Sequence, residues 1–163
     1  MSRESRDELI AAIFLAFREQ QTATELLDEA AWEVLGVNRT DGRCLDVIER
    51  EGSVTAGRLA AVAGLSSGAV TTAIDRLERA GLARRTADPG DRRKVLVELT
   101  ESGADSCDRI YGPLNDEGVE ALADYSERDL KALRDFFVLG RELLEAHTER
   151  VRAIAPRRDP VSS

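Results

Sequence analysis

The stretch that decides the fold is residues 55–100, TAGRLAAVAGLSSGAVTTAIDRLERAGLARRTADPGDRRKVLVELT. Thr55 can cap a short helix, because its side-chain oxygen can accept free backbone N–H groups, and Gly64 suits the left-handed residue that follows. Ser66 can cap a second helix, whose apolar residues recur at +4 and +3 spacing until Gly81 stops it. The pattern predicts two short helices joined by a tight turn.

The period of the sequence changes after Gly81. Residues 82–86 and 95–99 are short runs that suit β-strands, and the second run is rich in Val and Leu. Residues 88–94, DPGDRRK, separate the two runs, and Pro-Gly flanked by Asp is a turn signal. We therefore expect a β-hairpin with a basic tip and a basic return strand. Helix, turn, helix and hairpin, in this order, predict a winged helix-turn-helix.

Helices are also predicted before this stretch. An apolar stripe runs through residues 6–35 and Gly36 follows it, which indicates one long helix. Thr40 can cap a further helix that stops at Gly52. An aromatic content of only 4% also suits a helical core built from Leu, Ile, Val and Ala.

Two further helices are predicted after the hairpin. Thr100 can cap one that Gly112 and Pro113 should kink or interrupt near its middle. Ser126 can cap a last helix, with Asp129 three residues on in a capping-box-like arrangement. Apolar and small residues of this last helix recur at alternating +3 and +4 spacing, the heptad pattern of helix–helix association. This seam consists of Leu130, Leu133, Phe137, Gly140, Leu144, His147, Val151 and Ile154.

The fold class expected is mainly α with a small β-hairpin wing, a winged helix-turn-helix between long terminal helices. We expect an N-terminal dimerisation helix (1–36), a DNA-binding lobe (37–100), C-terminal helices that complete the dimerisation region (101–155) and a disordered polar tail (156–163). The apolar stripes of the terminal helices exceed what so small a monomer would cover, so a homodimer is expected. The residues expected at its interface are Leu9, Ile13, Leu130, Leu133, Phe137, Leu144 and Val151.

The charge is distributed unevenly along the chain. The net charge of −8 argues against nucleic-acid binding at first sight. Residues 52–100, however, hold eight Lys or Arg and five Asp or Glu, a net of +3, which leaves −11 on the rest. A basic segment in an acidic chain is the asymmetry expected of a DNA-binding lobe on an acidic scaffold.

The second short helix and the hairpin carry the candidate DNA contacts. A solvated helix face without function would more often show Glu and Lys than Ser and Thr, whereas small polar residues and Arg can reach base edges or phosphates in a major groove. On the hairpin, arginine is favoured in a narrow minor groove, or one arginine can instead pair with Asp75 and position the wing. The expected DNA contacts are Ser66, Ser67, Gly68, Thr71, Thr72, Arg76, Arg92, Arg93 and Lys94.

The sequence lacks the motifs that indicate other classes of function. No Gly-rich phosphate loop, nucleophile elbow or carboxylate pair at a strand end is present, so no enzymatic activity is expected. One histidine and no close cysteine pair predict neither a metal site nor a cofactor. No apolar run is long enough for a membrane span or a signal peptide. Cys44 and Cys107 are expected to be reduced core thiols of a cytoplasmic protein.

The chain resembles the multiple-antibiotic-resistance regulator (MarR) family. The resemblance lies in residues 40–45 (TDGRCL), 77–82 (LERAGL) and 88–100 (DPGDRRKVLVELT), and it extends to the order of elements over about residues 6–155. It implies a homodimer whose first and last helices interlock, and a transcriptional regulator, expected to be a repressor, that binds a pseudo-palindromic operator. It also implies release by a small aromatic or phenolic acid or by cysteine oxidation.

Three questions stay open at the level of sequence. Trp32 and Arg39 fall in the region where family members bind effectors, but a core Trp and an Arg paired with an acid are the favoured interpretation. A thiol-based redox sensor acting through Cys44 or Cys107 is an alternative regulator. A winged helix that serves only as a protein-interaction scaffold is the alternative from another class, and the +3 lobe argues against it.

Overall fold

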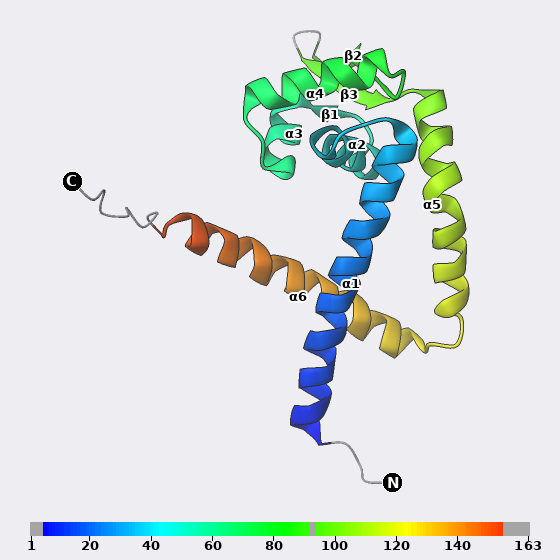
Figure 1. Ribbon diagram of the computed structural model, residues 1–163, viewed down its shortest axis with the longest axis vertical. Coiled ribbons are helices and arrows are strands. Elements are labelled where there is room, and N and C mark those ends of the chain that lie inside the picture. The colour runs from blue at the N-terminus through cyan, green and yellow to red at the C-terminus, as the bar shows by residue number, and fades with distance from the viewer. Residues whose placement is uncertain (1–4, 92–93, 155–163) are drawn as a thin grey trace, which may run out of the picture. The chain divides into compact units, whose positions relative to one another are not determined.

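The computed structural model describes residues 5–91 and 94–154, which form six helices and three short strands (Figure 1). By contacts the chain divides into two compact units, Met1–Leu114 and Asn115–Ser163. In chain order the elements are α1 (Arg6–Leu35), α2 (Arg39–Glu51), β1 (Val54–Thr55), α3 (Ala56–Ala63), α4 (Ser67–Arg79), β2 (Ala83–Ala87), β3 (Val95–Leu99), α5 (Glu101–Ala121) and α6 (Glu127–Arg152).

The sheet is antiparallel, with strand order β1-β3-β2. β3 coincides with the predicted run 95–99. β2 begins one residue later than the predicted run 82–86, since its first paired residue is Ala83, opposite Leu99. The strand β1, paired with β3 through Val54 and Val97, was not predicted. Two residues are too few to show a period of two in the sequence.

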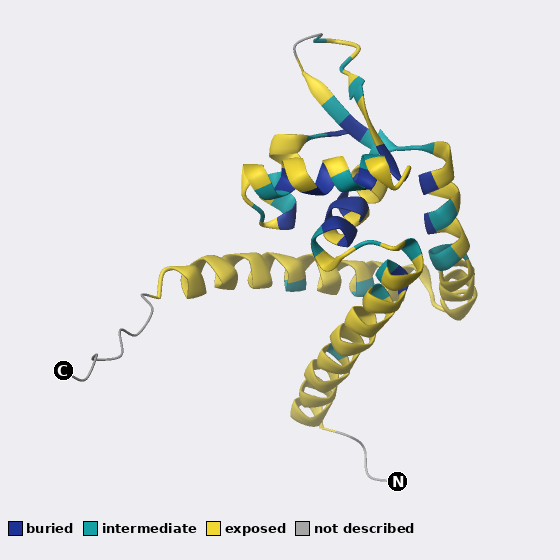
Figure 2. Cartoon of the chain, turned by 45° about the horizontal axis from the view of Figure 1, so that its top comes forward, coloured by how far each residue is buried: buried dark blue, intermediate teal, exposed yellow. Residues whose placement is uncertain are grey.

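The core lies inside the winged helix-turn-helix. α4 buries Val70, Ile74 and Leu77, the stripe with +4 and +3 spacing, and Figure 2 shows the buried residues gathered among α2, α3, α4 and the sheet. Leu59 of α3 and Ile48 of α2 are fully buried in the same cluster. Each such side chain contributes roughly 1.5–3 kcal/mol by leaving water. This cluster is what holds α4 in place within the lobe.

The helix caps follow the sequence signals with one exception. Thr55 and Ser66 cap α3 and α4 as predicted, and Gly36 and Gly64 adopt the left-handed conformation. The prediction of Thr40 as the cap of α2 was wrong. The cap is Asn38, whose extended backbone lets its side-chain oxygen accept the N–H groups of residues 40 and 41.

α5 is one helix from Glu101 to Ala121 with Pro113 inside it, so the interruption allowed for at Gly112 and Pro113 does not occur, while the alternative of a kink stays a prediction. Proline removes only one backbone donor from the helix. Thr100 caps the helix as predicted, since its Oγ1 accepts the N–H of Gly103 at 2.9 Å. A Cβ at Gly103 would overlap the backbone of Leu82, so glycine is required for α5 to start against the residues that follow α4.

α6 begins after Ser126, whose Oγ accepts the N–H of Asp129, as predicted. None of its described residues is buried. In the expected seam, Phe137, Leu144 and Val151 are each about half exposed, and Ile154 is 70% exposed. Within the second unit the apolar side chains of α6 therefore find no core, as the mostly exposed colour of this helix in Figure 2 shows.

The two compact units do not test the expected division into four parts. The first unit contains α1, the winged helix-turn-helix and the first part of α5. The division into dimerising and DNA-binding parts concerns function and stays a prediction. The expected tail, 156–163, lies outside the described residues.

Candidate nucleic-acid interface

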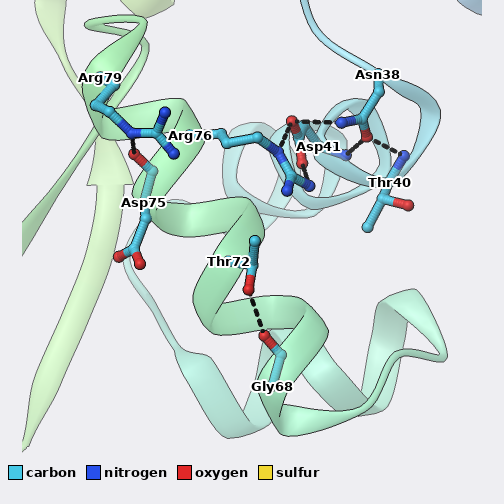
Figure 3. A network of polar contacts seen from close by, with 8 residues as sticks. All are labelled: Asn38, Thr40, Asp41, Gly68, Thr72, Asp75, Arg76 and Arg79. Atoms are coloured by element: carbon cyan, nitrogen blue, oxygen red, sulfur yellow. Dashed lines mark hydrogen bonds and ion pairs between the residues drawn. The ribbon is translucent and has the colours of Figure 1, made fainter.

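The exposed face of α4 consists of small residues. Ser67, Gly68, Thr71 and Thr72 are all exposed, and Ser66 caps the helix by accepting the N–H of residue 69 at 3.3 Å. The hydroxyl groups of Thr71 and Thr72 donate to the carbonyl oxygens four residues before them, at 3.0 Å each (Figure 3 shows the second). Each threonine therefore keeps its oxygen lone pairs and its methyl group for an external partner.

Gly68 leaves the first turn of α4 open. A Cβ built at this position meets no atom within 4 Å, so the packing of the lobe does not require glycine there. Glycine in a helix costs up to about 1 kcal/mol relative to alanine. An unprotected helix turn at this position allows another molecule to approach the backbone closely.

The guanidinium of Arg76 is turned toward α2. Its Nε and Nη2 donate to the two carboxylate oxygens of Asp41 at 2.7 and 2.5 Å, and the Asp41 residue is only 2% exposed (Figure 3). The hydrogen bond to this carboxylate raises the pKa of Arg76. Arg76 was expected among the DNA contacts, since no local pattern indicates a partner 35 residues away. The structure gives it an internal partner that joins α4 to α2.

Asp75 contacts the wing through Arg85, a residue that the sequence analysis did not single out. Arg85 Nη2 donates to Asp75 Oδ1 at 2.6 Å, and the same guanidinium bonds Glu78. Glu78 also accepts the backbone N–H of Arg85 at 2.9 Å. Two carboxylates of α4 therefore hold the first strand of the wing. The alternative partners of Asp75 considered from the sequence, Arg92 and Arg93, lie outside the described residues.

The base of the wing is ordered by turn chemistry and by a second ion pair. Asp88 Oδ1 accepts the N–H of Gly90 at 2.7 Å, and the N–H of Asp88 donates to the carbonyl of Lys94 at 3.1 Å. On the sheet, Arg84 pairs with Glu98 at 2.8 Å, and Ser53 donates to the same carboxylate. These bonds lower the pKa of Glu98.

Much of the basic charge of the lobe is paired internally. Arg58 forms two hydrogen bonds with Glu51, both of 2.8 Å, so four described arginines (Arg58, Arg76, Arg84 and Arg85) have carboxylate partners. Arg79 is exposed, and its Nε donates to the backbone carbonyl of Asp75. Glu51 and Asp41 lie outside residues 52–100, so the net of +3 counted over that segment overstates the positive charge that it offers to a ligand.

Both thiols are buried. Cys44 is 0% and Cys107 2% exposed, as expected of core residues. Burial raises the pKa of Cys44, and burial together with the nearby Glu49 raises the pKa of Cys107 to about 11. Both shifts disfavour the thiolate, which is the reactive form.

The two candidate effector residues differ in their surroundings. Trp32 is half-buried and lies against α2 so closely that a Cβ at Gly42 would overlap the indole ring. This agrees with the interpretation of Trp32 as a packing residue. Arg39 is exposed, and no carboxylate in the described part of the chain lies within ion-pair distance, so the expected acid partner is missing. Neither residue lies with the exposed face of α4.

Two further observations concern residues 5–91 and 94–154 alone. No group of three or more His, Cys, Asp or Glu residues there could hold a metal ion. No helix in the same ranges has the length and apolar character needed to cross a membrane.

Comparison with known proteins identifies the architecture. The MarR family model matches residues 35–94. The HTH-type transcriptional regulator YcgE of Bacillus subtilis (strain 168), itself uncharacterized, is 33% identical over 151 residues, 93% of this chain and 98% of that protein. Solved structures of similar fold include a MarR family transcriptional regulator from Silicibacter pomeroyi, with 26% identity and a TM-score of 0.61 over 91% of this chain and 99% of that one.

A further similar structure contains DNA. A point mutant of MarR from E. coli, complexed with operator DNA, is 27% identical with a TM-score of 0.51, covering 84% of this chain and 96% of that one. The family model covers the helix-turn-helix and most of the wing, and the B. subtilis relative covers nearly the whole chain. The chain belongs to the MarR family of winged helix-turn-helix transcriptional regulators.

Proposed function

We propose that this chain is a homodimeric repressor that binds a pseudo-palindromic DNA operator and is released by a small molecule. One observation carries the proposal: α4 turns a face of small polar residues outward while its apolar stripe and its arginine at position 76 face the lobe. The operator-bound structure of E. coli MarR supports double-stranded DNA as the partner. The protein acts by binding instead of catalysis, in the cytoplasm, where its DNA target lies.

α4 is the proposed recognition helix, and it enters the major groove with its N-terminal half. Ser66 and Ser67 with the free N–H groups of the first turn contact phosphates, since a helix N-terminus favours anions. Thr71 and Thr72 present lone pairs to base amino groups and methyl groups to thymine. Gly68 lets the helix backbone approach the DNA. Arg76 is removed from the proposed contacts because its guanidinium is already bonded to Asp41.

The wing is the proposed second contact. Arg92 and Arg93 enter the minor groove, where the negative potential is concentrated, and Lys94 contacts phosphate. Asp75 positions the wing through Arg85, which is anchored to two carboxylates of α4. Because four other arginines of the lobe have carboxylate partners, the basic residues of the wing tip are proposed to supply much of the positive charge that meets DNA.

The proposed dimer interface is formed by α6 and α1. The seam residues of α6 are exposed or half-buried, and Phe136, Leu139 and Leu143 extend the same apolar face. On α1, Leu9 and Ile13 are each 47% exposed. Exposed apolar faces of this extent mark association surfaces. A two-fold axis then sets two copies of α4 on successive major grooves.

The proposed signal is a small aromatic or phenolic acid that weakens operator binding. Thiol oxidation is a weaker alternative because both thiols are buried and have raised pKa values. A scaffold without DNA binding is disfavoured by the outward Ser and Thr face of α4 and by the operator complex of a relative.

The first prediction concerns salt and the wing. Affinity for a duplex from the DNA flanking its own gene should fall steeply with salt in a gel-shift series, because each phosphate contact releases counterions. Arg92→Ala with Arg93→Ala should weaken binding and reduce the logarithmic salt slope by about 4, because the bound dimer loses four arginines. The control, Arg134→Ala with Arg141→Ala, removes the same charge from α6 and should leave the slope unchanged. Absence of binding to every flanking duplex at low salt would overturn the proposal.

The second prediction concerns the open first turn of α4. Gly68→Ala should raise the free energy of unfolding by up to about 1 kcal/mol. The added methyl group should still weaken operator binding about tenfold, because it separates the helix from the DNA. Gly57→Ala is the matched control, since Gly57 is also the second residue of its helix and its Cβ meets only Thr55 Oγ1 at 4.0 Å. Equal affinities of the two variants would argue against a close approach at Gly68.

The third prediction concerns the apolar face of α6. Leu144→Lys should convert the dimer to monomer in analytical ultracentrifugation, because a lysine would be buried in the seam. Operator affinity should then fall by about 100-fold or more, since the two half-sites are no longer bound by a single dimer. Glu142→Gln changes the charge equally on the polar side of α6 and should remain dimeric. A dimeric Leu144→Lys variant would place the interface elsewhere.

The fourth prediction separates a redox sensor from a small-molecule sensor. Cys107, with its pKa raised to about 11 from 9.0, should be alkylated at least about 100-fold more slowly in the native protein than after denaturation. Asp105→Cys adds an exposed thiol on the same helix as a benchmark for fast reaction. Native thiols that react as fast as the benchmark, with loss of operator binding, would favour the redox alternative.

A further inference from the structure

The start of α2 and the helix α4 meet at the buried carboxylate of Asp41. Its Oδ1 accepts Arg76 Nη2 at 2.5 Å, and its Oδ2 accepts Arg76 Nε at 2.7 Å and Asn38 Nδ2 at 3.0 Å (Figure 3). Asn38 caps α2, Asp41 lies in the first turn of α2, and Arg76 belongs to α4. The carboxylate thus joins the start of α2 to the proposed recognition helix.

This pair constrains α4 in a way that apolar packing does not. A hydrophobic stripe tolerates small rotations and shifts, because its contacts are numerous, weak and undirected. A bidentate guanidinium–carboxylate pair fixes both distance and plane. Arg76 lies one helical turn after Thr72, so any rotation of α4 that strains the pair also moves the face proposed to meet DNA.

The same turn of α2 is in contact with α1. Gly42, next to Asp41, is buried under the indole ring of Trp32, and a side chain at position 42 would overlap that ring. Trp32 lies near the end of α1. A shift of the end of α1 therefore displaces the turn of α2 that carries Asp41, and the pair transmits the displacement to α4.

We propose that Asp41 is a positioning residue for DNA recognition: through Arg76 it sets the orientation of α4, and through Gly42 and Trp32 it ties that orientation to α1. The inference rests on the proposed DNA-binding function. It assigns no DNA contact to Asp41 or Arg76. It also gives the proposed effector a route, since a ligand that moves the end of α1 changes the fit of α4 to the operator.

The direction in which one substitution changes DNA affinity distinguishes this positioning role from a direct DNA contact by Arg76. In Asp41→Asn the guanidinium of Arg76 loses its charged partner and is free to move. If Arg76 contacts DNA, its release should strengthen binding. If the pair positions α4, its loss should weaken binding to the preferred sequence and leave non-specific binding nearly unchanged, since phosphate contacts need no precise orientation.

The experiment uses the full-length dimer and two probes. One is a duplex that the wild-type protein selects from a randomised pool, and the other is a scrambled duplex of the same composition. Fluorescence anisotropy gives the ratio of the two affinities at a temperature where circular dichroism shows every variant folded. Asp41→Asn should lower this ratio about tenfold, the effect of one charged hydrogen-bond pair. Glu51→Gln, which removes the carboxylate of another bidentate arginine pair in this lobe, should change it less than about twofold.

Two further measurements keep the test independent of folding. Arg76→Lys keeps the charge but not the bidentate geometry, and should lower the ratio even if Asp41→Asn does not fold. Trp32, the single tryptophan of the chain, should change its emission when the wild-type protein binds the selected duplex, and should change it less in Arg76→Lys.

Failure of the positioning role and failure of the proposed DNA-binding function give different results. A ratio unchanged in both Asp41→Asn and Arg76→Lys, or raised in Asp41→Asn, would overturn the positioning role while leaving DNA recognition intact. A wild-type protein that selects no duplex from the pool would instead overturn the proposed function itself.

Discussion

The buried carboxylate of Asp41 is the constraint on which the arrangement of the lobe depends. A charge at 2% exposure must be paired, because an unpaired buried charge costs several kcal/mol. Arg76 and Asn38 satisfy it, and no buried polar side-chain atom in the described residues lacks a partner. The consequence is that the guanidinium of Arg76 already has a carboxylate partner within the lobe. The exposed residues in the first half of α4 are small and neutral.

The same pairing governs the other charges of the lobe. Arg85 is held by Asp75 and Glu78, so the wing strand follows α4 as one piece. Arg84 and Arg58 have carboxylate partners but are more than half exposed, and such pairs exchange readily for phosphate. Under the proposed function, the positive charge that meets DNA comes from the wing tip, the start of α4 and exchangeable surface arginines. Arg76 and Arg85, each about one third exposed, fix the positions of α4 and of the first wing strand.

Local sequence patterns predicted the elements well and the long-range pairs poorly. Caps at Thr55, Ser66 and Ser126 rest on a side chain and an N–H within three residues, so the pattern contains the whole interaction. The Arg76–Asp41 bond spans 35 residues and the Arg85–Asp75 bond joins a strand to a helix, and neither leaves a periodic signal. Asn38 was overlooked in favour of Thr40 although Asn is the better N-cap residue, because two candidate caps stand two residues apart and the backbone conformation decides between them.

The contrast between the two units bears on how regulation can work. The first unit has a core of its own, whereas α6 buries none of its described residues. The winged helix-turn-helix can therefore stay folded whatever α6 contacts, while α6 needs a partner surface for its apolar face. A signal then has no need to unfold the lobe in order to release DNA. In the proposed mechanism, a small change at the Trp32–Gly42 contact is passed through the Asp41–Arg76 pair to the orientation of α4.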